Sequence, residues 1–137
     1  MAELAAALAA ASIGAMIFFS GLIAPTAFRA LPADTAGAFV RALFPNYFLF
    51  NGLAGVAASL LALPSLASAL LLVGGAALVA LRILVAPAVN NARDAMKAGD
   101  ALAKAAFARW HRASVVVNLA AIALYALAVW LLLGRAA

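Results

Sequence analysis

Long apolar stretches alternate with short polar segments along the whole sequence. The apolar stretches cover about residues 4–28, 48–63, 66–86 and 114–133. A helix rises about 1.5 Å per residue, so roughly 20 residues cross a hydrocarbon layer of about 30 Å. The pattern therefore predicts an all-α fold, an integral membrane four-helix bundle, in which residues 1–137 form a single four-span transmembrane domain.

Prolines are expected to interrupt the first half of the chain. Pro25 should bend or end the first span, because proline cannot donate a helical hydrogen bond. Asp34 can cap a short helix over Asp34–Phe44, which Pro45 is expected to end. The apolar residues of this segment share one side, which predicts a short interfacial helix between spans 1 and 2, lying flat or re-entering the membrane.

Prolines and glycines are also expected to interrupt the second half of the chain. Spans 2 and 3 are joined by a tight turn at Pro64-Ser65, and Pro87 is expected to close the third span. A cytoplasmic helical loop should follow, in which Gly99-Asp100 stops one helical segment and starts the next. Ala24-Pro25 and Ala86-Pro87 each end an odd-numbered span, which suggests two parallel two-helix repeats.

Composition narrows the possible chemistry. The chain is 70% hydrophobic and 9% charged, far below the roughly 25% charged residues of soluble domains. It has no cysteine, so disulfides, thiolate metal sites and iron–sulfur clusters are excluded. A net charge of +5 beside apolar spans indicates orientation and contact with anionic lipids, with no nucleic acid as a partner.

Basic residues are concentrated on one side of the expected bundle, whereas Arg135 stands alone on the other. The positive-inside rule then places both termini outside the cytoplasm, most simply in a bacterial inner membrane. Trp110 and Trp130 bracket the fourth span at the spacing of the two interfacial aromatic belts. The bases predict a cytoplasmic surface for anionic lipids or for a partner protein, formed by Arg41, Arg93, Lys97, Lys104, Arg109 and Arg112.

A polar stripe marks the fourth span, because His111, Ser114, Asn118 and Tyr125 recur at helical spacing. Asn51 enters the second span from the same side, so an intramembrane polar cluster is expected from Asn51, Ser114, Asn118 and Tyr125. Such residues can join helices through hydrogen bonds, or they can line a polar pocket that opens near His111. Both interpretations stay open at this point.

Catalytic and cofactor chemistry find little support. His111 is the only histidine and could bind haem or a quinone, but no second histidine, cysteine or carboxylate lies within a span. We therefore expect no metal site, no cofactor, no catalytic residue and no enzyme activity. The leading hypothesis is a non-enzymatic accessory subunit of a larger membrane complex, or a bundle that associates with itself. The alternatives are facilitated transport or export of a small solute near Asn51 and Asn118, and haem or quinone binding at His111.

Several short motifs occur together in a recognisable order. They are Ala24-Pro25-x-x-Phe28-x-x-Leu31-Pro32, Ala36-Gly37, Leu43-Phe44-Pro45-x-Tyr47-Phe48, Pro87 with Asn90, Asn91, Arg93 and Asp94, and His111-x-x-Ser114-x-x-x-Asn118. In this order and spacing the chain resembles the transmembrane-protein-205-like family of small four-span proteins. The resemblance covers nearly the whole chain, implies the same four-helix membrane fold, and carries no settled biochemical activity.

Overall fold

The computed structural model describes residues 1–134 and consists of long helices joined by short turns. In chain order the elements are α1 (Ala2–Phe18), the π-helical turn η1 (Phe19–Ile23), α2 (Ala24–Ala30), α3 (Ala33–Leu61), α4 (Leu66–Ala80), the π-helical turn η2 (Leu81–Val85), α5 (Ala86–Lys97) and α6 (Ala103–Leu133). The turns η1 and η2 continue into their neighbours, so the described chain forms four rods. Each rod is long and apolar enough to cross a membrane, which confirms the predicted all-α four-helix membrane protein.

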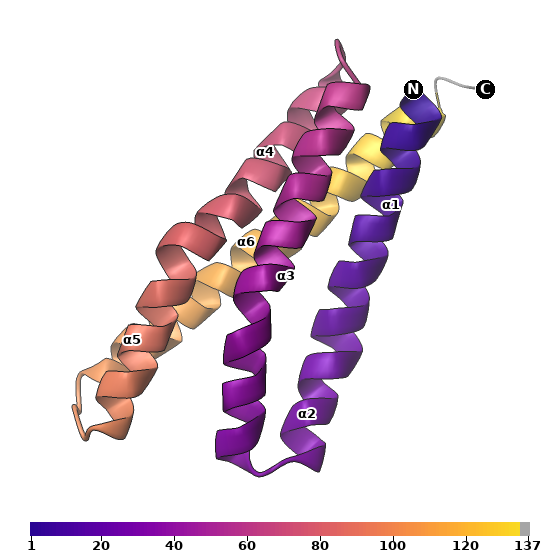
Figure 1. The fold of residues 1–137 in the computed structure, drawn as a ribbon. Helices are drawn as coiled ribbons and strands as arrows, with labels where there is room; N and C mark the ends of the chain where they lie inside the picture. Colours follow the sequence, from indigo (N-terminus) through magenta and orange to yellow (C-terminus); the bar gives the residue numbers. More distant parts are fainter. Residues whose placement is uncertain (135–137) are drawn as a thin grey trace.

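The rods run up and down, so their connections gather at two ends (Figure 1). The N-terminus, the α3–α4 turn and the end of α6 lie at one end. The α2–α3 and α5–α6 connections lie at the other, which we call the basic end because it carries Arg29, Arg41, Arg93, Lys97, Lys104, Arg109 and Arg112. Arg135, the base expected at the opposite end, lies outside the described residues.

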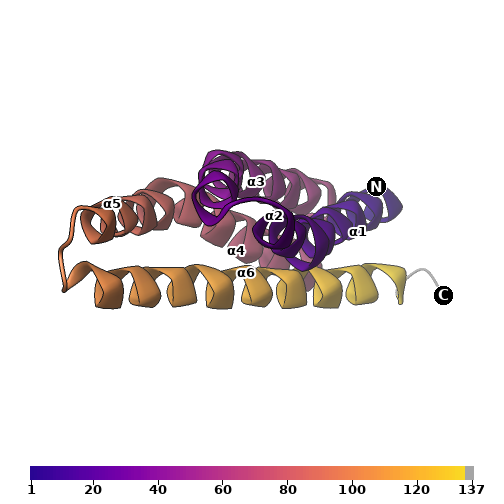
Figure 2. The ribbon, with the colours of Figure 1, turned by 90° about the horizontal axis from the view of Figure 1, so that it is seen from below.

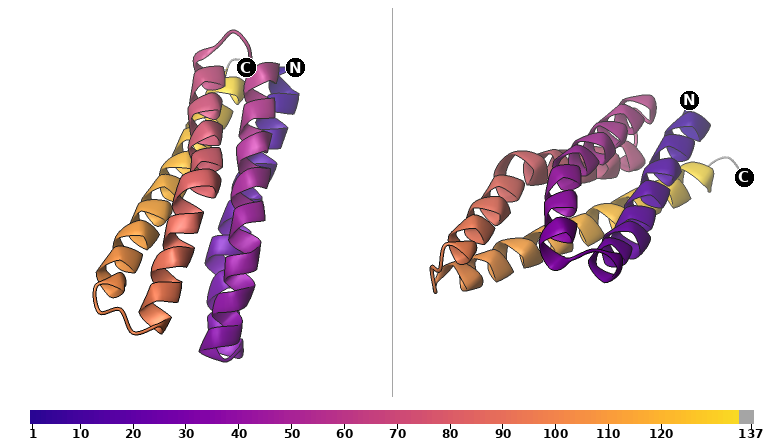
Figure 3. Two further views of the ribbon diagram at one scale, coloured as in Figure 1. Left: turned by 60° about the vertical axis from the view of Figure 1, so that its left-hand side comes forward. Right: turned by 60° about the horizontal axis from the view of Figure 1, so that its bottom comes forward.

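The helices pack in a ring in which α3 contacts α1 and α4, while α6 contacts α4 and α1. Viewed from the basic end, α3 and α6 lie on opposite sides of the bundle (Figure 2). The centre is filled by large side chains without exposed surface, among them Met16, Leu71, Leu78 and Tyr125. Towards the basic end, α5 and the start of α6 diverge from α2 and the start of α3 (Figure 3).

The prediction of a separate interfacial helix before the second span is wrong. Asp34–Phe44 is the first part of α3, which continues through Pro45 to Leu61. Proline has a φ angle that suits a helix, and its only backbone loss is the hydrogen bond to the carbonyl of Arg41. Leu43, Phe44 and Pro45 are partly buried against neighbouring helices, and a sequence reading of Pro45 as a helix end does not take such packing into account.

Pro25 and Pro87 also lie inside continuous rods, so Pro87 does not end the third helix as expected. Each proline follows a π-helical turn, in which a backbone N–H bonds to the carbonyl five residues earlier. The N–H of Ala24 bonds to Phe19, and that of Ala86 bonds to Leu81. These turns admit the proline without ending the helix, and their recurrence before both Ala-Pro pairs gives the two halves a shared structural feature.

The loop between the third and fourth rods is correspondingly shorter than predicted. The residues expected to form its helical parts belong to α5 and α6, which leaves only 98–102 as the connection. Gly99 ends α5 with a φ of +92°, a conformation that favours glycine, as the sequence predicted. The Asp100 carboxylate accepts the Leu102 N–H at 2.8 Å. Asp34 forms no cap, because α3 begins earlier, after Pro32.

Glycines allow α3 and α4 to approach closely. A Cβ atom on Gly75 would lie 2.8 Å from the carbonyl oxygen of Gly52 and 2.9 Å from the Val56 nitrogen. Both neighbours are backbone atoms, which cannot turn away as a flexible side chain could. The contact between these helices therefore depends on the missing side chain at Gly75.

We predict that Gly75→Ala lowers the free energy of unfolding by about 1–3 kcal/mol, because the helices must separate. Gly14→Ala is the matched control, since nothing lies within 4 Å of a Cβ at that helical position. The control should be neutral or stabilising by up to about 1 kcal/mol, because alanine favours helix more than glycine does. Unfolding by sodium dodecyl sulfate in mixed micelles, followed by circular dichroism, measures both. Equal effects would contradict the packing argument.

Candidate functional site

A chain of hydrogen bonds links three of the rods inside the bundle. Ser12 on α1 donates to the Asn51 side-chain oxygen at 2.7 Å, and the Asn51 amide donates to the Tyr47 carbonyl at 2.8 Å. The Tyr47 hydroxyl then donates to the Asn118 side-chain oxygen on α6, also at 2.8 Å. Ser20 lies 3.4 Å from the same hydroxyl and must be the donor, because tyrosine has only one proton to give.

Tyr125 fixes the inner end of this network. Its hydroxyl donates to the backbone carbonyl of Asn51 at 2.9 Å, and its side chain has no exposed surface. A Cβ on Gly55 or on Gly74 would overlap the phenol ring, so both glycines are needed to seat it. Tyr125 therefore joins α6 to α3 and closes the polar region on the side away from the basic end.

The network differs in detail from the arrangement that the stripe suggested. Asn51 and Asn118 are both buried, but they are linked through Tyr47. The backbone carbonyl of Tyr47 accepts from the Asn51 amide, and its hydroxyl donates to Asn118. Ser114 donates to the carbonyl of His111 in its own helix and joins no other element. The inner residues of the stripe thus bind helices together, whereas His111 and Ser114 face a cavity.

Sequence reasoning missed Tyr47 because Pro45 was taken to end a helix, which placed Tyr47 in a connection. Treated as one helix, residues Val40, Phe44, Tyr47, Asn51 and Gly55 recur every three or four positions and share a face. That periodicity, continued through the proline, is the signal that could have found Tyr47. Ser12 carries no comparable signal, since isolated serines are common in apolar spans.

A cavity of about 360 Å³ lies between the diverging rods at the basic end. Its walls come from η1, α2, α3, α5 and α6, and it starts at the depth of the two π-helical turns, beside Ser20 and Ala86. Most of the wall is apolar, formed by Phe28, Val40, Phe44, Phe48, Phe107, Val115 and Leu119. The polar side chains on it are Ser20, Arg41, Asn90, Arg93, His111, Ser114 and Asn118.

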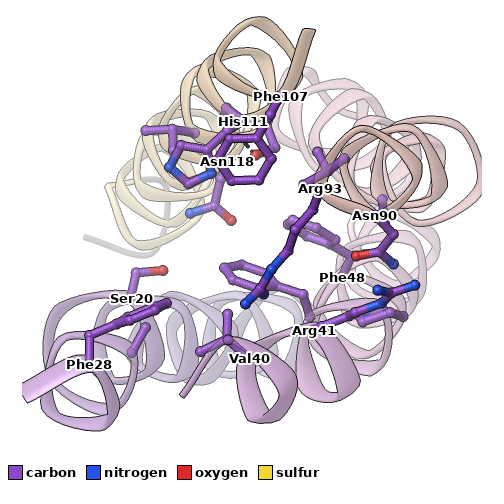
Figure 4. A pocket seen from close by; sticks show the side chains of 18 of the residues that line it. Ser20, Phe28, Val40, Arg41, Phe48, Asn90, Arg93, Phe107, His111 and Asn118 are labelled. Atoms are coloured by element: carbon purple, nitrogen blue, oxygen red, sulfur yellow. Dashed lines mark hydrogen bonds between the residues drawn. The ribbon is translucent and has the colours of Figure 1, made fainter. Parts of the chain in front are cut away.

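Arg93 is the cation that reaches furthest across this cavity. Its side chain extends from α5 towards α3 (Figure 4), where a Cβ on Gly37 would overlap the guanidinium group. Opposite it, the His111 ring stacks on Phe107, with centroids 5.8 Å apart and planes within 3°. Asn118 lies deeper, so the cavity leads from charged groups at the basic end to the hydrogen-bonded network.

Ion pairs hold α3 against α5 at the same end. Arg41 binds both carboxylate oxygens of Asp94, the second at 2.8 Å, and Lys97 pairs with Asp34. Both pairs are exposed, so salt screens them and they fix geometry more than they add stability.

The remaining predicted bases lie on α6, outside the cavity. Lys104 and Arg112 are exposed, and Arg109 packs over the Trp110 ring at 5.2 Å. Among residues 1–134, no group of three or more metal-binding side chains is close enough to hold an ion.

The sequence was compared with protein families, curated proteins and solved structures. It matches the family described as a domain of unknown function (DUF4149) over residues 7–98, which is more than half of the chain. The chain belongs to this family. The match covers α1 to α5 and stops before α6, so it includes Arg93 and Gly37 but not His111 or Asn118. No curated protein and no solved structure matches. Assignment to the transmembrane-protein-205-like family stays a prediction.

For this DUF4149 protein we predict that Tyr47→Phe lowers the free energy of unfolding by about 0.5–2 kcal/mol, because Asn118 loses its donor within the bundle. In Asn118→Leu the same hydroxyl loses its acceptor, so the double variant should cost less than the sum of the single variants. Detergent unfolding followed by tryptophan fluorescence measures this coupling. Ser114→Ala is the control and should change stability little, since its hydroxyl bonds only within α6. Strict additivity would contradict the network.

Proposed function

We propose that this small membrane protein is non-enzymatic and that it binds one amphipathic molecule in the cavity at its basic end. The observation that supports this is the composition of the cavity wall, in which aromatic and aliphatic side chains surround a few convergent polar groups. Sites for small ligands have this composition, and their volumes begin at about 300 Å³. The cavity lies in the part of the bundle where polar groups from η1, α3, α5 and α6 come together.

The local geometry favours binding over catalysis. The Ser114 hydroxyl donates to a backbone carbonyl, while the His111 ring stacks on Phe107, so the two are not arranged as a nucleophile and its base. Within the described residues, Arg41 and Lys97 engage Asp94 and Asp34, and the cavity wall includes no carboxylate. An imidazole without an acidic partner lacks the group that would orient it for proton transfer.

The opposite end of the bundle favours a binding site over a pore. At the inner end of the network and beyond it, Tyr125 and Leu71 have no exposed surface, and small residues bring the helices close together. Transport of a solute past Asn51 and Asn118 would require this layer to separate. A cavity confined to the basic end of the bundle holds its occupant without that step.

The proposal also includes the orientation of the protein in the membrane and its association with other subunits. The concentration of basic residues at one end supports a cytoplasmic location for that end, with both termini outside the cytoplasm of a bacterial inner membrane. Along the first rod, Ala7, Ala11 and Gly14 of α1 and Gly21 of η1 are exposed, and nothing lies within 4 Å of a Cβ at either glycine. Such small residues permit close helix contacts, which supports self-association or service as an accessory subunit.

We predict that a charged, water-soluble thiol reagent labels Ser114→Cys at least roughly tenfold faster than Ala120→Cys, because only a hydrated thiol ionises to the reactive thiolate. Ser114 faces the cavity, whereas Ala120 is exposed on the outer surface of α6. The natural chain has no cysteine, so each variant carries one label. Mass spectrometry of time points gives the rates. Equal, slow labelling would show that no water-filled cavity exists and would refute the proposed site.

The orientation can be tested with the same chemistry. We predict that an impermeant reagent added to intact cells labels Ser65→Cys, in the α3–α4 turn, and leaves Asp100→Cys unlabelled until the inner membrane is opened. These residues lie in the connections at opposite ends of the bundle. The reverse pattern would place the basic end outside.

A further inference from the structure

We infer that the occupant of this cavity is an anionic phospholipid whose phosphate binds Arg93 and whose acyl chain leaves between α2 and α6. This inference rests on the proposed binding function and names the chemistry of its ligand. It comes from the charge balance at the α3–α5 contact, from the seat of the Arg93 side chain, and from the way the cavity meets the outer surface.

The charge balance leaves Arg93 available. Three cations and two carboxylates meet where α3 and α5 touch, and the carboxylates are engaged by Arg41 and Lys97. The hydrogen bonds and ion pairs of residues 1–134 include none from Arg93. Arg93 lies near enough to Asp34 and Asp94 to help lower the pKa of both, but no carboxylate among these residues lines the cavity itself, so Arg93 is the cation there without an ion pair. A phosphate group, with several acceptor oxygens, matches a guanidinium in both charge and geometry.

The Arg93 side chain has a seat that keeps it in the cavity. Its guanidinium lies against the backbone of α3 at Gly37, where any larger residue would overlap it. Asn90, one turn earlier on α5, and His111 on α6 also line the cavity (Figure 4). These groups can donate hydrogen bonds to further oxygens of one headgroup.

The apolar part of the cavity continues onto the surface that faces lipid. Phe28 on α2 and Val115 and Leu119 on α6 line the cavity, yet they are 54%, 42% and 59% exposed. An acyl chain can therefore pass from the cavity into the bilayer without crossing a polar surface. A soluble anion would make no favourable contact with this apolar wall, which favours a lipid over free phosphate.

Depth supports the same assignment. His111 directly follows Trp110, and tryptophan prefers the level of the lipid headgroups. Arg93 lines the same cavity as His111, at the basic end of the bundle, which is where membrane phosphates would lie if Trp110 marks the headgroup level. A lipid can reach this site by lateral diffusion, with its headgroup already at the correct level.

The test is native mass spectrometry of the full chain in mild detergent, titrated with phosphatidylglycerol or with phosphatidylcholine of the same acyl chains. We expect one phosphatidylglycerol per chain, bound roughly tenfold more tightly than phosphatidylcholine. Arg93→Gln should lose that preference. Lys104→Gln removes the same charge from an exposed position outside the cavity and should keep it. Equal losses in both variants would indicate general surface attraction and would overturn the inference.

A second variant separates position from charge. Gly37→Ala keeps every charge but displaces the guanidinium, so it should weaken phosphatidylglycerol binding as Arg93→Gln does. Circular dichroism shows whether each variant is folded. Unchanged binding by folded Gly37→Ala would contradict the proposed seat. Inorganic phosphate at the same concentration as the lipid should not displace the lipid. Displacement would show that the site binds a soluble anion and would contradict the lipid assignment.

Protection of Ser114→Cys distinguishes the two levels of the proposal. If phosphatidylglycerol slows the labelling and phosphatidylcholine does not, both the binding function and the anionic ligand are supported. Equal slowing by phosphatidylcholine, or a co-purifying quinone in place of lipid, leaves the binding function standing and overturns the anionic ligand. Labelling that no amphiphile slows refutes the binding function itself.

Discussion

Inside a bilayer, every backbone polar group must find its partner within the protein, and this structure is shaped by how it meets that demand around its prolines. Pro25, Pro45 and Pro87 each remove a donor from a rod that must nevertheless cross the membrane. Two of them are preceded by π-helical turns, in which the hydrogen bonds shift by one residue. The rods persist, but their course changes towards the basic end, and the cavity lies where they diverge.

The same demand explains why the polar side chains form a connected set. An amide such as that of Asn51 is costly in hydrocarbon unless both its oxygen and its nitrogen are engaged. Ser12 and the Tyr47 carbonyl supply those partners, and Tyr125 adds a bond to the Asn51 backbone. The side-chain oxygen of Asn118 accepts from the Tyr47 hydroxyl at the edge of the cavity. Helix association and cavity lining are therefore tasks of one network, and the two interpretations of the stripe both describe part of it.

The sequence predicted the number of rods, their up-and-down order, the charged end and the turn at Gly99, because hydropathy and glycine conformation act locally. It failed at Pro45 and Pro87, where the effect of a proline depends on neighbouring helices and on a change of helix type that no residue pattern announces. Asn51, Asn118 and Tyr125 were selected by their polarity alone. Arg93 was placed in a surface patch, because only the tertiary contacts show that Asp34 and Asp94 are engaged by other cations.

The recurrence of a π-helical turn at one depth in both halves also has a mechanical side. Such a turn already lacks part of the regular bonding ladder, so bending there breaks fewer bonds than bending elsewhere along a rod. α2 and α5 thus join the packed core through the segments of their rods where helices most often kink. If an amphipathic molecule binds in the cavity, a change of angle at these two turns would alter the width of the cavity without disturbing the glycine-packed contact of α3 with α4.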